Sequence, residues 1–418
     1  MVDFAALRTA DPASLRTAAE GWVALSKESW QAVDDLHANG IGPLREDWKD
    51  RVGQAAGKKL EEQARILEAD ADILRGVAMV VDGLASSVEY AQQALHRALD
   101  LAAAYRLEVD QAGTVSTTGE VTSESITHMN EVSDLIREAL REARQADDQA
   151  SAELRKLAGA TCETDPQRAL DQLQGEASQV QLNMLDGDIP DGRDPALVAR
   201  WWSSLTPEQQ RQLELADPVK LANLPGIPDD VKEDLRGGPN RKFDRVKMVE
   251  WTLAHWNDKS GDFDDENNCT NFASEALFQS GVKMKGDWTF EGDAWNRGDD
   301  PGWLGLGIVG QQHSHAWGGA QNLHDFMVSN GGREVPPSEV KPGDLVFLED
   351  DNDLNPDLKQ GNIHHTAIVT AVTPDGDIRY SQHNDSRKNV SLDGRSGHEA
   401  ESEGRQKMHF VRVEPNWY

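Results

Sequence analysis

The residues best suited to chemistry in this 418-residue sequence are Cys269 and the histidines that follow it. Cys269 comes directly after Asn268, and apolar residues between 272 and 277 predict a helix that begins at the cysteine and is capped by Asn268. At the first helical position, the positive end of the helix dipole and unpaired backbone N–H groups favour the thiolate, which is the nucleophile. The N–H of Cys269 is also free to stabilise an oxyanion.

A thiol nucleophile needs a base, and histidines stand at the ends of two predicted strands. His364-His365 opens one strand, and His383-Asn384 closes the next, beyond the turn Pro374-Asp375-Gly376. A histidine within reach of the sulfur, held by a third polar group, is what nucleophilic catalysis requires. His365 and His383 are separated by a spacing that one hairpin can bring side by side, so we expect these strand ends to form the site.

Two other patterns suggest metals, and we expect neither to bind one. His313-Ser314-His315 and His364-His365 could contribute to a zinc site, but a metal there would leave Cys269 unexplained. The acidic run from Asp351 to Asp357 imitates a calcium loop, but Pro356 occupies the position that needs glycine. We therefore expect a solvated rim at this run, and no metal or cofactor.

The elements that must position these residues lie in the last of three predicted segments. Residues 241–418 combine early helices with strand patterns at 344–348, 366–372, 378–381 and 409–413, which predicts an α+β domain with an antiparallel sheet. Residues 1–158 are rich in helix-forming residues with apolar positions three and four apart, which predicts an all-α hairpin or bundle. We expect its helices to break at 39–43 and at 113–125, with a further helix over 125–158.

Residues 159–240 are predicted to be a connector with short helices. Proline, glycine and aspartate accumulate there, and Thr206-Pro207 is a helix start. Cys162 lies at the beginning of this connector without a histidine or aspartate nearby, and we expect it to be inert.

Composition excludes several classes of partner. The net charge is -31, and no segment is basic enough to neutralise phosphates, so neither nucleic-acid binding nor adhesion to an anionic membrane is expected. The longest strongly apolar stretch, Val77 to Val81, is far shorter than a membrane span, so no membrane insertion is expected. The first residues lack a basic region followed by an apolar one. We expect either secretion by a route that reads no such signal peptide or a cytoplasmic location.

Several segments in the same order show that residues 245–415 resemble the amidase domains related to the NlpC/P60 and CHAP cysteine peptidases. These segments are Asn268-Cys269-Thr270-Asn271-Phe272-Ala273-Ser274, Trp317 with Asn322-Leu323-His324-Asp325-Phe326, Lys341-Pro342-Gly343-Asp344-Leu345-Val346, His365-Thr366-Ala367-Ile368-Val369, and Gln382-His383-Asn384-Asp385-Ser386-Arg387-Lys388-Asn389. The resemblance implies a papain-like fold with nucleophile Cys269, base His365 and third residue His383. His364 is the alternative base. Asn384 is the alternative third residue, because a register change of one residue exchanges strand faces.

The first part of the chain has its own resemblance. Ala10-Asp11-Pro12 with Leu15, Ala18-Ala19-Glu20-Gly21-Trp22 and Trp48 after the helix break resemble actinobacterial WXG100-like secretion domains over residues 5–115. This resemblance implies export through a type VII system and a helical secretion partner. A plain helical bundle with Trp48 in its core is the simpler interpretation.

Together these patterns predict a multidomain protein with a thiol-dependent amidase or peptidase. The resemblance implies peptidoglycan peptides as substrate, in a secreted effector or toxin with a helical export domain. Two alternatives remain open: a toxin protease that cleaves a protein and needs an immunity partner, and a non-catalytic protein that binds cell wall and docks a partner.

Overall fold

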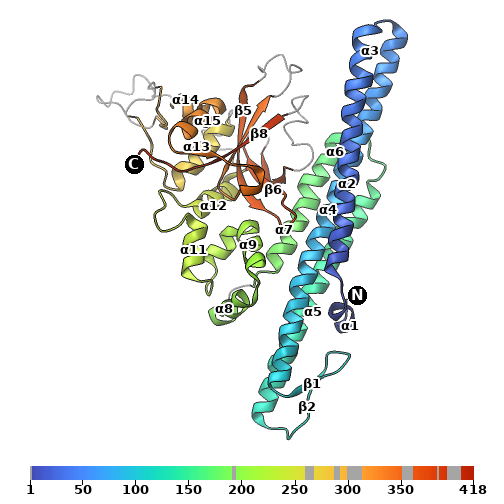
Figure 1. Ribbon diagram of the computed structural model, residues 1–418, viewed down its shortest axis with the longest axis vertical. Helices are drawn as coiled ribbons and strands as arrows, with labels where there is room; N and C mark the ends of the chain where they lie inside the picture. The colour runs from blue at the N-terminus through green and yellow to red at the C-terminus, as the bar shows by residue number, and fades with distance from the viewer. Residues whose placement is uncertain are drawn as a thin grey trace. The chain divides into compact units, whose positions relative to one another are not determined.

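The computed structural model describes residues 2–190, 194–258, 268–286, 292–298, 313–350, 361–383, 386–392 and 406–418. By contacts the chain divides into two compact units, Met1–Pro190 and Asp191–Tyr418. Figure 1 shows that the first unit is helical and that the larger sheet lies in the second. This confirms the predicted fold class at the level of a helical first part and an antiparallel sheet in the second.

The helical unit is built from three long helices joined by short segments. The long helices are α2 (Pro12–Leu36), α4 (Arg51–Ala104) and α5 (Ser123–Gly159). The shorter elements are α1 (Phe4–Arg8), the π-helix η1 (His37–Ile41), α3 (Gly42–Asp47), β1 (Leu107–Val109), β2 (Val115–Thr117), α6 (Pro166–Asp171), the π-helix η2 (Gln172–Ala177) and α7 (Ser178–Gly187). Apolar residues recurring along α4 and α5 form two buried clusters between the helices, which is why these helices pair.

The predicted break at 39–43 is wrong in its position. The chain stays helical through η1 and α3, because Leu36, Ile41 and Gly42 keep right-handed helical backbone angles and α3 continues η1 without a turn. The helix ends instead at Trp48, and Asp50 caps α4 by accepting bonds from the N–H groups of Val52 and Gly53. A Cβ on Gly53 would lie 2.6 Å from Cγ of Trp48, so the turn requires a glycine there. Trp48 itself is exposed rather than in the core.

The segment predicted as a connector divides between the two units. Its first part, α6 to α7, packs along α4 and α5, where Ala169, Ala177 and Met184 join a buried cluster with Ile73 and Leu157. Its second part belongs to the second unit. There α8 (Pro195–Ser204), α9 (Pro207–Ala216), α10 (Pro218–Asn223) and α11 (Asp229–Arg236) precede the sheet. The predicted helix start at Thr206 is confirmed, because its side chain accepts a bond from the Gln209 N–H.

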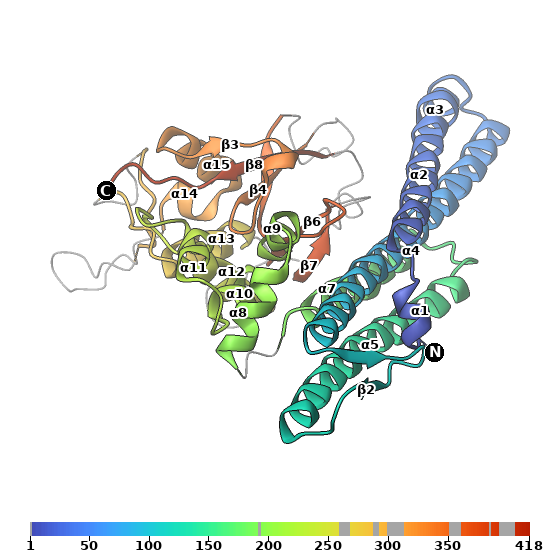
Figure 2. The same cartoon turned by 60° about the horizontal axis from the view of Figure 1, so that its bottom comes forward.

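The described part of the second unit holds four further helices and one six-stranded sheet. The helices are α12 (Arg245–His255), α13 (Cys269–Gln279), α14 (His315–Gly318) and α15 (Ala320–Ser329), with the 3-10 turn η4 (Pro337–Glu339). The strands are β3 (Arg333–Glu334), β4 (Leu345–Asp350), β5 (Ile363–Val372), β6 (Ile378–Gln382), β7 (Arg387–Ser391) and β8 (Gln406–Arg412). All described pairs are antiparallel, in the order β3-β8-β4-β5-β6-β7, and most can be followed in Figure 2. The four predicted strands are confirmed, and β3 and β7 were not predicted.

Each face of the sheet has its own apolar core. One core joins Phe272, Trp295, Trp317 and Leu323 from the helical side to Leu345, Phe347 and Ile368 of the strands. The other lies beneath Val346, Val369 and Tyr380. Alternate strand residues therefore point into different cores, which makes the register of each strand decisive for the site. Within the described residues, no helix has the length and apolar character needed to cross a membrane.

Candidate active site

Cys269 is the first residue of α13, as the sequence predicts, and its side chain is buried. Asn268 occupies the capping position but does not cap the helix with its side chain. Its Oδ1 atom lies 2.7 Å from Nδ1 of His383 instead. The cap predicted for the Asn268 side chain is therefore wrong, because His383, directly after β6, competes for the same oxygen. The first N–H groups of α13 are consequently left uncovered by this amide.

The helix that carries the cysteine is anchored by its buried face. Phe272 packs in the core against Trp251, with ring centroids 5.3 Å apart. Ser274 donates to the carbonyl of Trp317 at 2.9 Å and accepts from Nε1 of Trp295 at 3.0 Å. These contacts explain why apolar residues and a serine follow the cysteine, and they fix the position of the helix N-terminus.

His365 lies near the start of β5, where the pairing with β4 is irregular. Leu348 pairs with His365 and Glu349 with Ile363, so that His364 is an extra residue in the strand. Such a bulge changes the direction of the side chains beside it. The Nε2 atom of His365 lies 2.9 Å from Oε1 of Gln382, and the imidazole is hydrogen-bonded to the thiol of Cys269.

The surroundings of Cys269 act on its thiol in opposite directions. Burial raises the pKa, but the charge and hydrogen bond of His365 lower it, as do the backbone N–H of Thr366 and the hydroxyl of Thr270. Together they lower the pKa of Cys269 from 9.0 to about 7. A thiolate is therefore available near neutral pH, next to a histidine that can carry its proton.

The residue bonded to the far nitrogen of His365 is Gln382, not His383. Ile368 pairs with Ser381, and in this register Gln382 falls on the same face of the sheet as His365 while His383 falls on the other. His383 lies against Asn268 and the carbonyl of Asp258, 2.6 Å from its Nε2. The structure thus gives Gln382 the contact to His365 that was expected of His383, and a catalytic role for His383 stays a prediction. Gln382 was not among the residues expected from the sequence, although it comes directly before His383.

The remaining candidates have other surroundings. Asn384 and the acidic run 351–357 lie outside the described residues. His364 is bonded to Gln406, and burial lowers the pKa of its imidazole. The other cysteine, Cys162, is exposed.

Among the residues that the structure describes, the histidine pairs considered for zinc form no cluster of metal ligands. In the part of the chain that the structure describes, one group of three such side chains does converge, and it consists of His324, Glu334 and His409.

Asp344, in the segment before the histidine strand, has a structural place. It is fully buried and bonds to Arg245 of α12 at 2.5 Å and to Arg412 of β8 at 2.9 Å. It also accepts from the backbone N–H of Lys341. One carboxylate therefore ties the helix before α13 to the central strands and indirectly holds the frame of the site.

The comparisons with known proteins point to the same part of the chain. Residues 242–411 match the family model described as "Putative amidase domain". The uncharacterized protein YhbB of Bacillus subtilis is 27% identical over 136 residues, which cover 31% of this chain and 38% of that protein. This chain thus spans well under half of that relative's length. No solved structure matches it.

The amidase-matched region, residues 242–411, contains each of the three residues brought together here. They are Cys269, His365 and Gln382. The match makes this region similar to an amidase domain, whose members are expected to hydrolyse amide bonds. The geometry adds a buried thiol with a lowered pKa, an adjacent imidazole and an amide that holds the imidazole.

Proposed function

We propose that the second unit is a cysteine amidase or peptidase of papain-like fold, with Cys269 as nucleophile, His365 as base and Gln382 as the positioning residue. The observation that carries the proposal is the hydrogen bond between His365 and a thiol at a helix N-terminus, with the pKa of that thiol lowered to about 7. A structural cysteine in a core needs neither a base nor a lowered pKa.

The acylation step follows from these contacts. His365 holds the proton of Cys269, and the thiolate attacks the carbonyl carbon of a substrate amide. The resulting oxyanion is stabilised by the Cys269 N–H and the N-terminus of α13. The imidazolium then protonates the amide nitrogen, the C–N bond breaks, and the amine leaves a thioester on the sulfur.

Deacylation uses the same residues in reverse. His365 takes a proton from water as the water attacks the thioester, and the C–S bond breaks to release a carboxylic acid and the thiolate. Through these steps the Gln382 oxygen accepts the Nε2–H of His365. That contact leaves Nδ1 as the nitrogen that exchanges protons with sulfur.

The substrate class within this proposal is the stem peptides of peptidoglycan, as the resemblance implies. The same chemistry would cleave an amide in a protein, so a toxin protease is the rival within the same class. A toxin of this kind would need an immunity protein in the cell that makes it.

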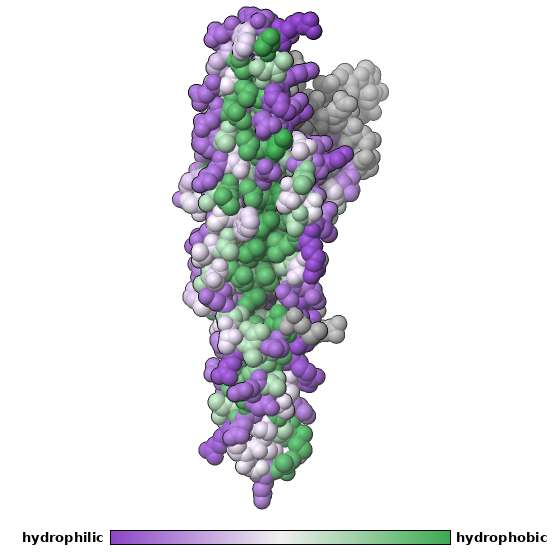
Figure 3. Space-filling view, turned by 90° about the vertical axis from the view of Figure 1, so that its right-hand side faces the viewer, coloured by the Kyte–Doolittle hydropathy of each residue, from purple (hydrophilic) through white to green (hydrophobic). Residues whose placement is uncertain are grey.

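For the helical unit we propose a partner-docking role, in export or in delivery of an effector. Large apolar side chains are exposed there, including Trp22, Leu25, Trp48 and Val52. Hydrophobic residues also follow much of the side drawn in Figure 3. Exposed apolar surface of this extent supports binding to another helix, such as a secretion partner. If the helical unit serves export, the protein is secreted without a cleaved signal peptide. If it docks a partner inside the cell, the protein stays in the cytoplasm.

The decisive experiment incubates the full chain with purified peptidoglycan and detects new amines and fragments by mass spectrometry. A parallel incubation uses a mixture of denatured proteins, which separates the two substrate classes. Cys269→Ala and His365→Ala should each lower turnover by about 10³-fold or more with unchanged circular dichroism. Cys162→Ala is the matched control and should be silent. Full turnover by the Cys269 variant would remove the nucleophile, and no turnover by the wild type on either substrate would favour the non-catalytic binding role.

A further inference from the structure

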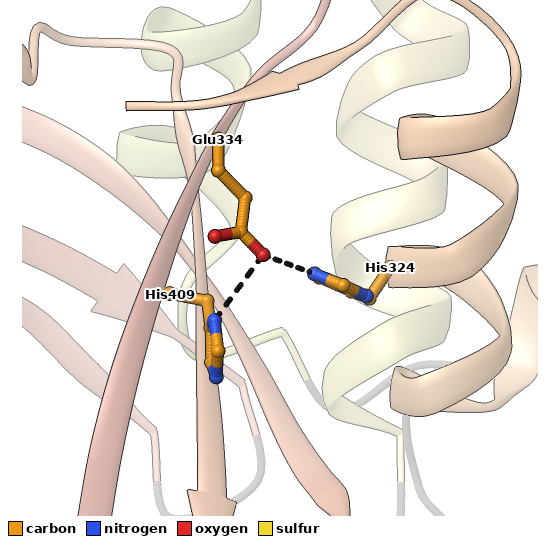
Figure 4. Close-up of side chains that lie close together, drawn as sticks. All are labelled: His324, Glu334 and His409. Atoms are coloured by element: carbon orange, nitrogen blue, oxygen red, sulfur yellow. Dashed lines mark hydrogen bonds and ion pairs between the residues drawn. The ribbon is translucent and has the colours of Figure 1, made fainter. Parts of the chain in front are cut away.

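Two histidines and a glutamate from three different elements meet at the end of the sheet formed by β3 and β8. His324 lies on α15, Glu334 on β3 and His409 on β8, and their ligand atoms all lie within 4.8 Å of one another. Figure 4 shows both rings directed at the same oxygen of Glu334. These residues take no part in the chemistry proposed for Cys269.

The fold determines this meeting. Glu334 pairs with Val411, which places it on the same face of the sheet as His409, two residues earlier in β8. Phe347 of β4 pairs with His409 of β8. The ring of His324 packs edge-on against the ring of Phe347, with ring centroids 5.2 Å apart. Helix α15 therefore lies over this corner and brings His324 into it. The Glu334 Oε1 atom is 3.2 Å from Nε2 of His324 and 3.3 Å from Nδ1 of His409.

Each ring is also held from behind by a second carboxylate. Nδ1 of His324 lies 3.0 Å from Asp325, and Nε2 of His409 lies 2.6 Å from Glu349. Lys407 is 3.5 Å from the same Glu349 oxygen. A histidine that ligates a metal usually donates its other N–H to a carboxylate or carbonyl in this way.

The placement of carboxylates around the two rings favours a cation at the centre. A neutral imidazole carries one N–H, and here both nitrogens of each ring face a carboxylate. If the N–H of His324 points to Asp325 and that of His409 points to Glu349, the other nitrogen of each ring has a free lone pair. Both lone pairs then face the Glu334 oxygen. Those three groups repel one another, and a metal ion between them would remove the repulsion.

We propose that His324, Glu334 and His409 bind a divalent transition-metal ion, with zinc as the best fit, and that Asp325 and Glu349 orient the two histidines. Two imidazoles and one carboxylate are a common zinc ligand set, with a fourth position left for water. In a tetrahedral zinc site with bonds of about 2.0–2.1 Å, ligand atoms lie about 3.3–3.4 Å apart. The two contacts to Glu334 already have this length.

The proposed ion would hold α15 and the two-residue strand β3 onto β8. Glu334 is exposed and β3 contributes only two residues to the sheet, so the ion would add to the ion pairs of Arg333 with Glu339 and Glu414 at this edge. Binding to the folded state alone stabilises it by mass action. This role is independent of the amidase chemistry and does not rest on it.

The test uses the full chain with both cysteines replaced, Cys162→Ser and Cys269→Ser, so that a thiol site cannot bind the probe. Titration with Zn²⁺ alone should show one ion bound per chain and a raised melting temperature. His324→Gln, Glu334→Gln and His409→Gln should each weaken binding by at least about 100-fold. Asp325→Asn should weaken it by about 10- to 100-fold, as outer-shell changes do.

The first matched control is Glu339→Gln, in the 3-10 turn η4 that follows β3. The second is His315→Gln, which changes one of the histidines considered for zinc from the sequence. Both should bind Zn²⁺ as the parent does. Co²⁺ in place of Zn²⁺ should give a tetrahedral visible spectrum that Glu334→Gln abolishes. The proposal is overturned if the parent binds no Zn²⁺ at pH 7.5, or if Glu334→Gln and His409→Gln, folded by circular dichroism, bind it unchanged.

Discussion

At the residue scale, the properties of Cys269 result from a competition. Burial alone would keep the thiol protonated, and His365 reverses this effect by its charge and its hydrogen bond. The pair is therefore one titrating unit, and removal of the histidine changes the cysteine even where the fold is intact.

Alkylation should report this coupling. In a Cys162→Ser chain, the rate of Cys269 alkylation by iodoacetamide should be half-maximal near pH 7 and fall at lower pH, because protonation removes the thiolate. His365→Ala should move the midpoint to higher pH, because the group that lowers the thiol pKa is gone. An unchanged midpoint in that variant would contradict the coupling. The chain with both Cys162→Ser and Cys269→Ser supplies the background rate, and the Cys269→Ser chain gives the rate of the exposed Cys162 for comparison.

Substitutions of the neighbouring residues Gln382 and His383 should differ in their effect on kcat. Gln382→Ala should lower kcat by about 10- to 100-fold with little change in KM, because the His365 ring loses the acceptor that holds its tautomer. Gln382→Asn tests whether a shorter amide can restore part of the rate. A structural role would instead change stability and leave the pH profile of kcat unmoved.

His383→Ala is the companion measurement. This change removes the contact to Asn268 and so disturbs the start of α13, but it leaves the Nε2 contact of His365 in place. We expect a smaller loss of kcat than for Gln382→Ala. A larger loss would restore His383 as the orienting residue.

At the element scale, the second unit depends on a buried charge cluster. Asp344, directly before β4, bonds to Arg245 of α12 and Arg412 of β8, and its carboxylate is fully buried. Gly343, with φ of 84°, makes the turn that directs Asp344 inward. Pro342-Gly343-Asp344, directly before β4, thus stabilises the fold and takes no part in the proposed chemistry.

Loss of the carboxylate should be severe. Asp344→Ala should lower the free energy of unfolding of the second unit by about 3–5 kcal/mol, because two arginines would remain buried without their partner. Asp230→Ala, at an exposed position in the first turn of α11, is the control and should cost less than about 1 kcal/mol. Urea denaturation followed by tryptophan fluorescence measures both. Equal effects of the two changes would show that the cluster contributes little.

At the scale of the whole molecule, the division falls after Pro190 rather than at either end of the predicted connector. The reason is apolar burial. Leu170, Leu173 and Met184 are buried in the helical unit, and their burial contributes about 5–9 kcal/mol as an upper limit.

Fragments test this boundary. Residues 1–190 and 194–418 should each fold alone and unfold cooperatively. A fragment of residues 1–158, which lacks α6 to α7, should be less stable than 1–190 by several kcal/mol. Thermal unfolding followed by circular dichroism makes the comparison. If 1–158 and 1–190 melt together, the later helices contribute nothing and the boundary lies at 158.

Much of the architecture could be read from local patterns. The helix that begins at Cys269, the strand that carries His365 and the turn at Pro374-Asp375-Gly376 follow from side-chain periodicity and turn chemistry. These features depend on residues close together in the chain, and the two residues of the thiol–imidazole pair could therefore be named from the sequence.

Only the tertiary structure decided which side chains meet across elements. Gln382 rather than His383 faces His365 because the strand register, and a bulge at His364, set the direction of each side chain. Helix α3 ends at Trp48, and this end depends on how closely Gly53 can approach Trp48. The cluster of His324, Glu334 and His409 unites three elements and has no local signature. A one-residue change of register reverses the face of a side chain, and nothing in a local pattern excludes that change.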